Sequence, residues 1–190
     1  METKNILLVG VGGQGTILAS KILSDGLLEK GCDVKMSEIH GMSQRGGSVS
    51  TQIRFGDKVR SPIIGMGEAE LIVAFEKMEA LRWFSYLKPG GRMVINDFEI
   101  PSAPILMGLA DYPSGILEEL SAKAAVSVCK AAEIAAKLGN VKAMNIVLLG
   151  ALVKILGPDD VDWNAVIARN VKKGFEELNV KAFEAGAGQA

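Results

Sequence analysis

A glycine-rich segment near the amino terminus has the residue types of an anion-binding turn. The segment Gly10-Val11-Gly12-Gly13-Gln14-Gly15 has the spacing GxGxxG, directly after an apolar run, and Thr16 follows it. Glycines let the backbone turn sharply and approach a ligand, and unpaired amides at the start of a helix favour negatively charged groups. The segment therefore predicts a phosphate-binding loop. Glycines that only close a strand against a helix would give the same spacing.

A second segment is dense in polar and conformationally free residues. It reads Glu38-Ile39-His40-Gly41-Met42-Ser43-Gln44-Arg45-Gly46-Gly47-Ser48. A guanidinium holds phosphate or carboxylate with two parallel hydrogen bonds, and neighbouring glycines expose backbone donors, so Arg45, Gly46 and Gly47 favour an anion clamp. The alternatives are a solvated surface charge at Arg45 and turn caps at the polar residues of both loops, which are Gln14, Ser43 and Gln44.

Groups for acid–base or redox chemistry are few. His40 is the only histidine; an imidazole changes charge near neutral pH, but a lone histidine is more often a hydrogen-bonded structural residue. Glu38 lies where a dinucleotide-binding domain places the acid for a ribose hydroxyl, which would suit NAD or another adenosine-bearing ligand such as S-adenosylmethionine. Cys32 and Cys129 are too few for a four-thiolate cluster. We assign no catalytic residue and no metal site to this chain, and expect a partner to complete its chemistry.

Length and charge limit the kind of protein this is. The chain has 190 residues, 48% of them hydrophobic, with 21 basic against 22 acidic side chains. We expect one domain over residues 1–185 and a flexible tail at 186–190. The near-zero net charge argues against nucleic acid as a partner, and the longest apolar segment, Ala143–Val153, is too short to cross a membrane. The amino terminus predicts a strand and not a signal peptide, so we expect a cytoplasmic protein.

Apolar periodicity predicts an alternation of strands and helices. The expected strands are Asn5–Val11, Asp33–Glu38, Ser48–Phe55, Glu70–Phe75 and Arg92–Phe98. The expected helices are residues 17–28, 76–86 and 121–138, the apolar segment Val141–Leu156, and a last helix that starts near Asp162 and keeps helical spacing to Leu178. Between them, Lys88–Gly91 is expected as a turn, and Pro101–Pro113 as a loop or one further short strand.

The predicted architecture is a three-layer, Rossmann-like α/β fold with a mostly parallel sheet and a C-terminal helical layer. In such a sheet, the glycine loop and residues 38–48 leave the carboxyl ends of neighbouring strands and face one crevice. The two loops therefore predict a single site. The apolar helix Val141–Leu156 would pack either in the core of this domain or against a partner.

The two loops resemble those of a known family, the gamma domain of the 2-oxoacid:ferredoxin oxidoreductases. The resemblance extends from Gly10 to the closing helices and covers nearly the whole chain. The glycine loop is widely shared, whereas residues 38–49 are more discriminating. There, His40-Gly41-Met42-Ser43-Gln44 resembles the indolepyruvate branch of the family, while pyruvate and 2-oxoglutarate relatives usually carry a Tyr-Gly-Pro-Glu type of sequence ahead of Arg-Gly-Gly.

The resemblance implies one subunit of an oxygen-sensitive, hetero-oligomeric complex. Such a complex decarboxylates an aryl pyruvate, passes two electrons to ferredoxin and yields an acyl-CoA. Thiamine diphosphate, magnesium and the 4Fe-4S clusters are expected on a larger partner subunit, with coenzyme A as co-substrate and no metal or covalent cofactor in this chain. The isolated chain is expected to be inactive, and a homodimer is one form it could take alone.

For the site, the resemblance implies a coenzyme A crevice and no use of NAD, so Glu38 is not expected to bind ribose. Backbone or hydroxyl groups of the first loop would contact phosphate, namely those of Gly12, Gly13, Gln14, Gly15 and Thr16. The clamp on the same ligand would consist of Arg45, Gly46 and Gly47.

Other interpretations of the same residues stay open. One places Arg45 with His40, Ser43 and Gln44 at the active site or the subunit boundary, where they would shape access to the thiamine. Two rival functions come from other classes of protein: a stand-alone NAD-dependent oxidoreductase, and a non-enzymatic module that binds a nucleotide in the glycine crevice.

Overall fold

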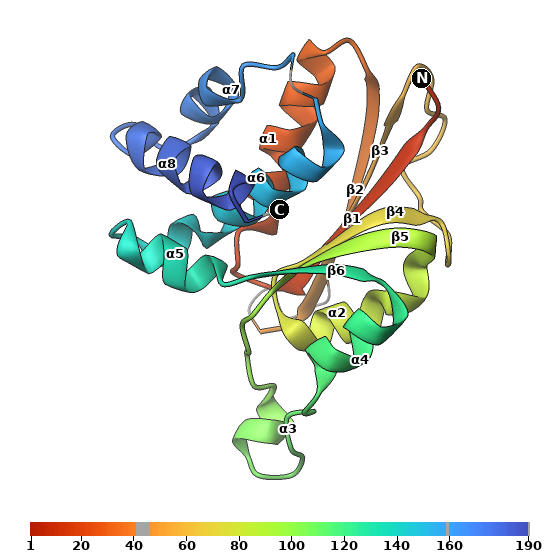
Figure 1. Cartoon of the computed structure of the whole chain (residues 1–190), viewed down its shortest axis with the longest axis vertical. Helices are drawn as coiled ribbons and strands as arrows, with labels where there is room; N and C mark the ends of the chain where they lie inside the picture. Colours follow the sequence, from red (N-terminus) through yellow and green to blue (C-terminus); the bar gives the residue numbers. More distant parts are fainter. Residues whose placement is uncertain (41–45, 159, 190) are drawn as a thin grey trace.

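A six-stranded mixed sheet forms the centre of the molecule. The computed structural model describes residues 1–40, 46–158 and 160–189 (Figure 1). The strands are β1 (Lys4–Val11), β2 (Asp33–His40), β3 (Ser48–Gly56), β4 (Ala69–Ala74), β5 (Leu87–Asn96) and β6 (Ala125–Cys129), in the order β2-β3-β1-β4-β5-β6. β3 runs antiparallel to β1 and β2, and the other neighbouring pairs are parallel. The prediction of a mostly parallel sheet is therefore confirmed.

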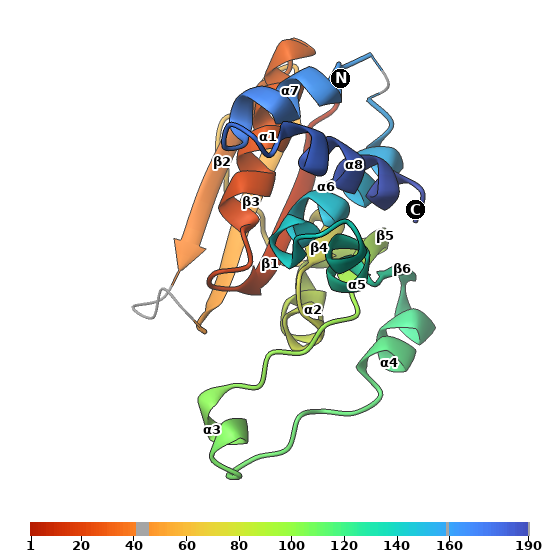
Figure 2. The ribbon, with the colours of Figure 1, turned by 90° about the vertical axis from the view of Figure 1, so that its left-hand side faces the viewer.

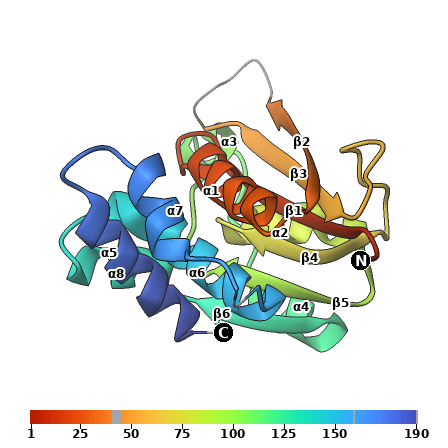
Figure 3. The same ribbon diagram turned by 90° about the horizontal axis from the view of Figure 1, so that it is seen from above.

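Helices cover both faces of this sheet. They are α1 (Thr16–Glu29), α2 (Lys77–Trp83), α3 (Ala103–Leu106), α4 (Ile116–Lys123), α5 (Ala131–Lys137), α6 (Met144–Leu156), α7 (Trp163–Asn170) and α8 (Glu176–Ala187), with short 3-10 turns at Phe84–Tyr86 and Val141–Ala143. One face carries α2 and α4, and the other carries α1 with the C-terminal helices (Figures 1 and 3). The three layers are as predicted. Within the described residues, every helix is too short or too polar to span a bilayer.

Strand β1 is buried on both faces because its side chains alternate between two apolar clusters. Ile6 and Leu8 pack with residues of α1 and α6, whereas Leu7 and Val9 pack with residues of α2 and α4. All four side chains are at most 1% exposed. The continuous apolar run in the sequence is thus that of a central strand covered by helices on both sides, as predicted.

Helix α6 lies inside the domain. Its residues 144–153 are all buried, and α8 crosses it with very close backbones. A Cβ on Gly150 would lie 2.0 Å from the carbonyl oxygen of Phe183, and a Cβ on Gly186 would lie 1.8 Å from that of Val147. This apolar helix therefore packs within the core of the chain, which settles one of the alternatives that the sequence left open.

The predicted helix over residues 121–138 is wrong. Helix α4 ends at Lys123, strand β6 follows, and a separate helix, α5, begins at Ala131. β6 extends the sheet beyond β5 as a parallel edge strand. The alternation Val126-Ser127-Val128 suits a strand, and pairing with β5 outweighs the helix propensity of the surrounding alanines.

Other boundaries also differ from the prediction. The helix expected over residues 162–178 is two helices, because the chain breaks near Gly174, whose φ is +90°. Residues 88–91, expected as a turn, belong to β5. Residues 101–113 contain the short helix α3 and no strand. Residues 186–187, expected in a flexible tail, are the last two of α8.

We expect Gly186→Ala to destabilise the protein strongly. The added methyl group would overlap the Val147 carbonyl oxygen, and this backbone atom can only move if α6 and α8 separate. Overpacking of this kind costs about 1–3 kcal/mol. Gly188→Ala is the matched control, because a Cβ there would come no closer than 3.5 Å to the atoms around it. Urea unfolding of both variants gives the comparison, and equal free energies of unfolding would contradict this helix crossing.

Candidate functional site

A cavity of about 410 Å³ lies between the first turn of α1 and the sheet face formed there by β2 and β3. Strand register decides which side chains reach it, since residues two apart on a strand share a face. Glu38 pairs with Thr51 and His40 with Val49, and these residues share the face of Ile53, which packs in the cluster beneath α1. The cavity is lined by Gly12, Gly13, Gly15, Thr16, Ile17, Glu38, Ile39, His40, Val49, Ser50 and Thr51. The structure thus brings four predicted residues of the first loop and His40 to one cavity.

Two glycines of the first loop are required for different reasons. Gly13 has φ +102°, and a Cβ there would meet no atom within 4 Å. Gly15, the cap residue before α1, has φ +80°, and a Cβ there would lie 2.6 Å from Nδ2 of Asn145. The same Nδ2 donates a 3.1 Å hydrogen bond to the Gly15 carbonyl oxygen. Gly15 is therefore fixed by packing against α6, whereas Gly13 leaves backbone open to a ligand.

Gln14 braces the first loop from inside. It is 5% exposed and does not line the cavity. Its Oε1 accepts a hydrogen bond from the Val11 amide at 2.8 Å, and its Nε2 donates to the Phe75 carbonyl oxygen at 2.8 Å. Its own backbone amide donates to the Val11 carbonyl oxygen. These bonds give the Gln14 side chain a positioning role within the turn, which is one of the alternatives that the sequence left open.

The two predicted loops meet through their glycines. The Gly12 amide donates to the Gly47 carbonyl oxygen at 2.9 Å, and the Gly46 amide donates to the Gly12 carbonyl oxygen at 3.4 Å. The prediction that the two loops follow neighbouring strands is wrong, because β3 lies between β1 and β2. The loops meet all the same, since β3 begins beside the end of β1. The other predicted residues of the second loop lie outside the part of the chain that the structure describes: Ser43, Gln44 and Arg45.

A buried carboxylate holds the start of β3. The Ser48 hydroxyl donates to Oε2 of Glu79, and Arg82 Nε lies 3.1 Å from Glu79 Oε1. Sequence reasoning missed Glu79, because nothing in the pattern of α2 shows that this residue faces the second loop. It also missed Asn145, although a polar amide within an apolar helix is a signal for a buried hydrogen bond.

The carboxyl ends of three parallel strands are tied together beside the cavity. The Phe75 carbonyl oxygen, just after β4, accepts from Gln14 Nε2 and, at 3.1 Å, from Nδ2 of Asn96 at the end of β5. Oδ1 of Asn96 accepts from the Ala131 amide at 3.0 Å, at the start of α5. Since Asn96 is fully buried, this network is shielded from water. The edge from which the glycine loop starts is therefore rigid.

The charges around the cavity favour an anion on one side and oppose it on the other. The free amides of the first turn of α1, a helix of 14 residues, stabilise negative charge. Glu38 projects from the facing strand β2 and is exposed. No lysine or arginine lines the cavity within the described residues. An anionic ligand is thus favoured beside α1 and disfavoured beside the end of β2.

The described residues hold neither a metal-binding group nor an activated thiol. Among them, no three His, Cys, Asp or Glu side chains come together to bind a metal ion. Cys32 and Cys129 are both free and buried. Burial raises the pKa of the Cys129 thiol to about 11, and burial is also the main cause of the raised pKa of Cys32. Both thiols stay protonated at neutral pH and pack as small apolar side chains.

Known proteins match this chain along nearly its whole length. Residues 5–189 match the pyruvate ferredoxin/flavodoxin oxidoreductase family. The chain belongs to this family. The indolepyruvate oxidoreductase subunit IorB of Pyrococcus horikoshii is 40% identical over 194 residues, which cover 98% of this chain and 95% of that subunit. The predicted family, and within it the resemblance to the indolepyruvate branch, are confirmed.

Solved structures of pyruvate ferredoxin/flavodoxin oxidoreductase relatives share this fold. The gamma subunit of keto/oxoacid ferredoxin oxidoreductase from Geobacter sulfurreducens has a TM-score of 0.76 at 23% identity, covering 100% of this chain and 97% of that one. The 2-oxoglutarate:ferredoxin oxidoreductase of Magnetococcus marinus, with 2-oxoglutarate, coenzyme A and succinyl-CoA bound, has a TM-score of 0.69 at 16% identity, covering 100% of this chain and 31% of that longer chain. As a family member, this chain is one subunit of a hetero-oligomeric 2-oxoacid:ferredoxin oxidoreductase, as expected.

Gln14→Ala is expected to lower the free energy of unfolding by about 1–3 kcal/mol, because it leaves the buried Val11 amide without its side-chain acceptor. The Phe75 carbonyl oxygen keeps its second donor, Asn96. Gln189→Ala, at an exposed position, is the control. Urea unfolding measures both variants. A Gln14→Ala protein as stable as the control would contradict the bracing role.

Proposed function

We propose that this chain binds coenzyme A for an indolepyruvate (aryl pyruvate):ferredoxin oxidoreductase. In that reaction a 2-oxoacid loses carbon dioxide, its acyl group passes to coenzyme A, and two electrons reduce ferredoxin. The observation that carries the proposal is the cavity at the amino end of α1, where the open backbone of Gly13 and the first helical amides can receive a phosphate group.

The composition of the cavity supports coenzyme A over a simple inorganic anion. The apolar residues Ile17 and Val49 line it together with the glycines and the threonines Thr16 and Thr51. Such a mixed lining suits a ligand that joins phosphates to less polar groups, and a volume of about 410 Å³ lies within the range of small-molecule sites. The coenzyme A bound in the related enzyme from Magnetococcus marinus supports the same choice.

The remaining machinery is assigned to a larger partner subunit. That subunit would hold thiamine diphosphate, magnesium and the 4Fe-4S clusters, accept the aryl pyruvate, and pass electrons to ferredoxin. The residues of this chain would bind and orient coenzyme A and form the subunit boundary, and none of them is proposed to be catalytic. His40 lines the cavity, and we assign it to this boundary role. A cytoplasmic location stays a prediction.

One observation favours a second candidate, a stand-alone NAD-dependent oxidoreductase. Glu38 lies at the end of β2 and lines the same cavity as the glycine loop, which is where a carboxylate accepts the ribose hydroxyls of NAD. Coenzyme A carries a phosphate on its ribose, so the same carboxylate would repel that end of the molecule. Glu38 therefore separates the two candidates.

Arg45→Ala is expected to weaken coenzyme A binding to the assembled complex. Loss of a charge-assisted hydrogen bond to phosphate costs about 1.5–3 kcal/mol, which is roughly a 10- to 150-fold higher Kd. Calorimetric titration of the anaerobic complex with coenzyme A gives the value. Unchanged affinity would contradict the clamp, and lost turnover or assembly at unchanged affinity would place Arg45 at the subunit boundary.

Glu38→Gln is expected to strengthen coenzyme A binding by up to several-fold, because it removes a negative charge from the cavity that receives the phosphates. The same titration measures it, with Glu2→Gln, an exposed acid near the amino terminus, as the control. Weaker coenzyme A binding, together with NAD binding that depends on Glu38, would contradict the proposed function and favour the dehydrogenase.

A further inference from the structure

Residues 99–115, here called the arm, leave the body of the molecule between β5 and α4. Figure 2 shows the arm extending away from the sheet and its helices, with the four-residue helix α3 near the tip. Three side chains of the arm are among the most exposed large apolar side chains of the described residues: Leu106 at 75%, Met107 at 65% and Leu109 at 74%. Apolar groups clustered at a protruding tip are typical of a surface that a partner covers.

The tip has a defined backbone in spite of its exposure. The Met107 amide donates to the Ala103 carbonyl oxygen at 3.0 Å, and the Leu109 amide donates to that of Pro104 at 2.9 Å. Gly108 closes the turn with φ +70°. These bonds hold the backbone while the apolar side chains point to solvent. The tip is therefore ordered before any partner covers it, which reduces the entropy lost on binding.

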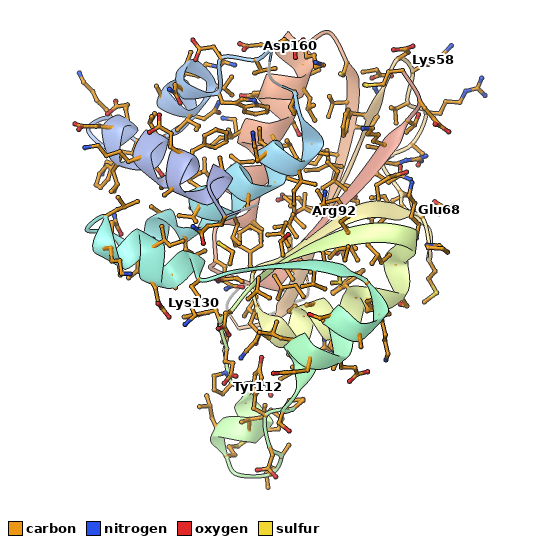
Figure 4. All side chains as sticks on the ribbon, in the orientation of Figure 1. Lys58, Glu68, Arg92, Tyr112, Lys130 and Asp160 are labelled. Atoms are coloured by element: carbon orange, nitrogen blue, oxygen red, sulfur yellow. The ribbon has the colours of Figure 1, made fainter. Side chains whose placement is uncertain are left out.

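A single buried carboxylate fixes both ends of the arm. Oε1 of Glu76, a residue 1% exposed, accepts hydrogen bonds from the Ile100 amide at 3.2 Å and from the Tyr112 hydroxyl. The Tyr112 oxygen in turn accepts from the Met78 amide at 3.1 Å. Figure 4 labels Tyr112 where the arm joins the body. Lys77 forms ion pairs with Asp97, just before the arm, and with Glu99, its first residue. The arm thus has a fixed base and an apolar tip.

The arm leaves the same edge of the sheet as the coenzyme A cavity. β1, β4 and β5 are parallel, so the glycine loop after β1 and the arm after β5 both start from carboxyl ends. Hydrogen bonds through α2 also connect the base of the arm with the second loop. The Glu76 carboxylate, which holds the arm, accepts from the Glu79 amide at 2.9 Å. The Glu79 carboxylate in turn accepts from the hydroxyl of Ser48 at the end of the second loop. A protein that holds the tip would therefore approach the end of the sheet at which the glycine loop of the cavity lies.

From this arrangement we infer that the arm docks this chain onto the larger, thiamine-bearing subunit, which receives Met107 and Leu109 in an apolar pocket. The inference rests on the proposed function. Acyl transfer from a thiamine site on one subunit to coenzyme A on the other requires the two subunits to meet at the edge of the sheet that carries both the cavity and the arm. Acyl transfer does not require a second copy of this chain at that edge, so the larger subunit is the occupant that we infer.

The test compares two matched double variants in the full-length chain. Met107→Ser with Leu109→Ser removes apolar groups from the tip outside α3. Ile63→Ser with Met66→Ser removes apolar groups that are also mostly exposed, 54% and 72%, from the loop before β4, at the opposite edge of the sheet. Each variant is mixed anaerobically with the separately produced larger subunit, identified by its thiamine diphosphate and iron. Sedimentation then gives the Kd of assembly and the self-association of each chain alone.

We expect the tip variant to assemble with a Kd at least roughly 30-fold higher than the wild-type chain, while its thermal unfolding and coenzyme A affinity stay unchanged. The loop variant should assemble like the wild-type chain. Equal assembly of the tip variant and the wild-type chain would overturn the inference and leave the proposed function standing. Loss of self-association alone would overturn it by identifying a second copy as the occupant. A wild-type chain that assembles with no thiamine-bearing subunit would overturn both.

Discussion

The carbonyl oxygen of Phe75 is the acceptor on which the carboxyl edge of the sheet depends. It accepts hydrogen bonds from the side-chain amides of Gln14, which follows β1, and Asn96, which ends β5. Both donors are buried, where an unpaired amide costs about 1–3 kcal/mol, so the three strand ends can separate only at a cost that exceeds ordinary thermal energy. The glycine loop and the arm both start from this edge, so these hydrogen bonds hold the first residues of both segments in place.

The antiparallel strand β3 forms one wall of the cavity beside that edge. In an all-parallel sheet, the chain leaving β2 would enter a helix and carry the second loop away. Here it returns directly along β1, with eight residue pairs from Lys4 opposite Phe55 to Val11 opposite Ser48. The contacts of Gly12 with Gly46 and Gly47 continue this ladder beyond the strands. The cavity is therefore walled by a sheet on one side and by α1 on the other.

Local signals explain what the sequence predicted well. The apolar run before the glycines predicted β1, and helical spacing after them predicted α1. The last helical segment was expected to start near Asp162, whose side chain accepts a hydrogen bond from the Ala165 amide at the start of α7. The antiparallel direction of β3 and the strand β6 depend on pairing with strands far away in the sequence. The hydrogen bond from Gln14 to Phe75 could not be predicted for the same reason, because the two residues are 61 positions apart. Patterns within one segment do not contain such contacts.

Two carboxylates near the start of α2 show how a chain with no assigned catalytic group can still matter for a reaction. Glu76 and Glu79 lie at the amino end of this helix, where backbone amides stabilise negative charge, and donors from three separate segments satisfy them. Burial, with the nearby Glu76 carboxylate as a further cause, raises the pKa of Tyr112, so its hydroxyl remains a donor at neutral pH. The start of β3 and the base of the arm are thus held by one short helix. A ligand beside the first loop and a protein on the arm would share this scaffold, because buried hydrogen bonds fix both the start of β3 and the base of the arm.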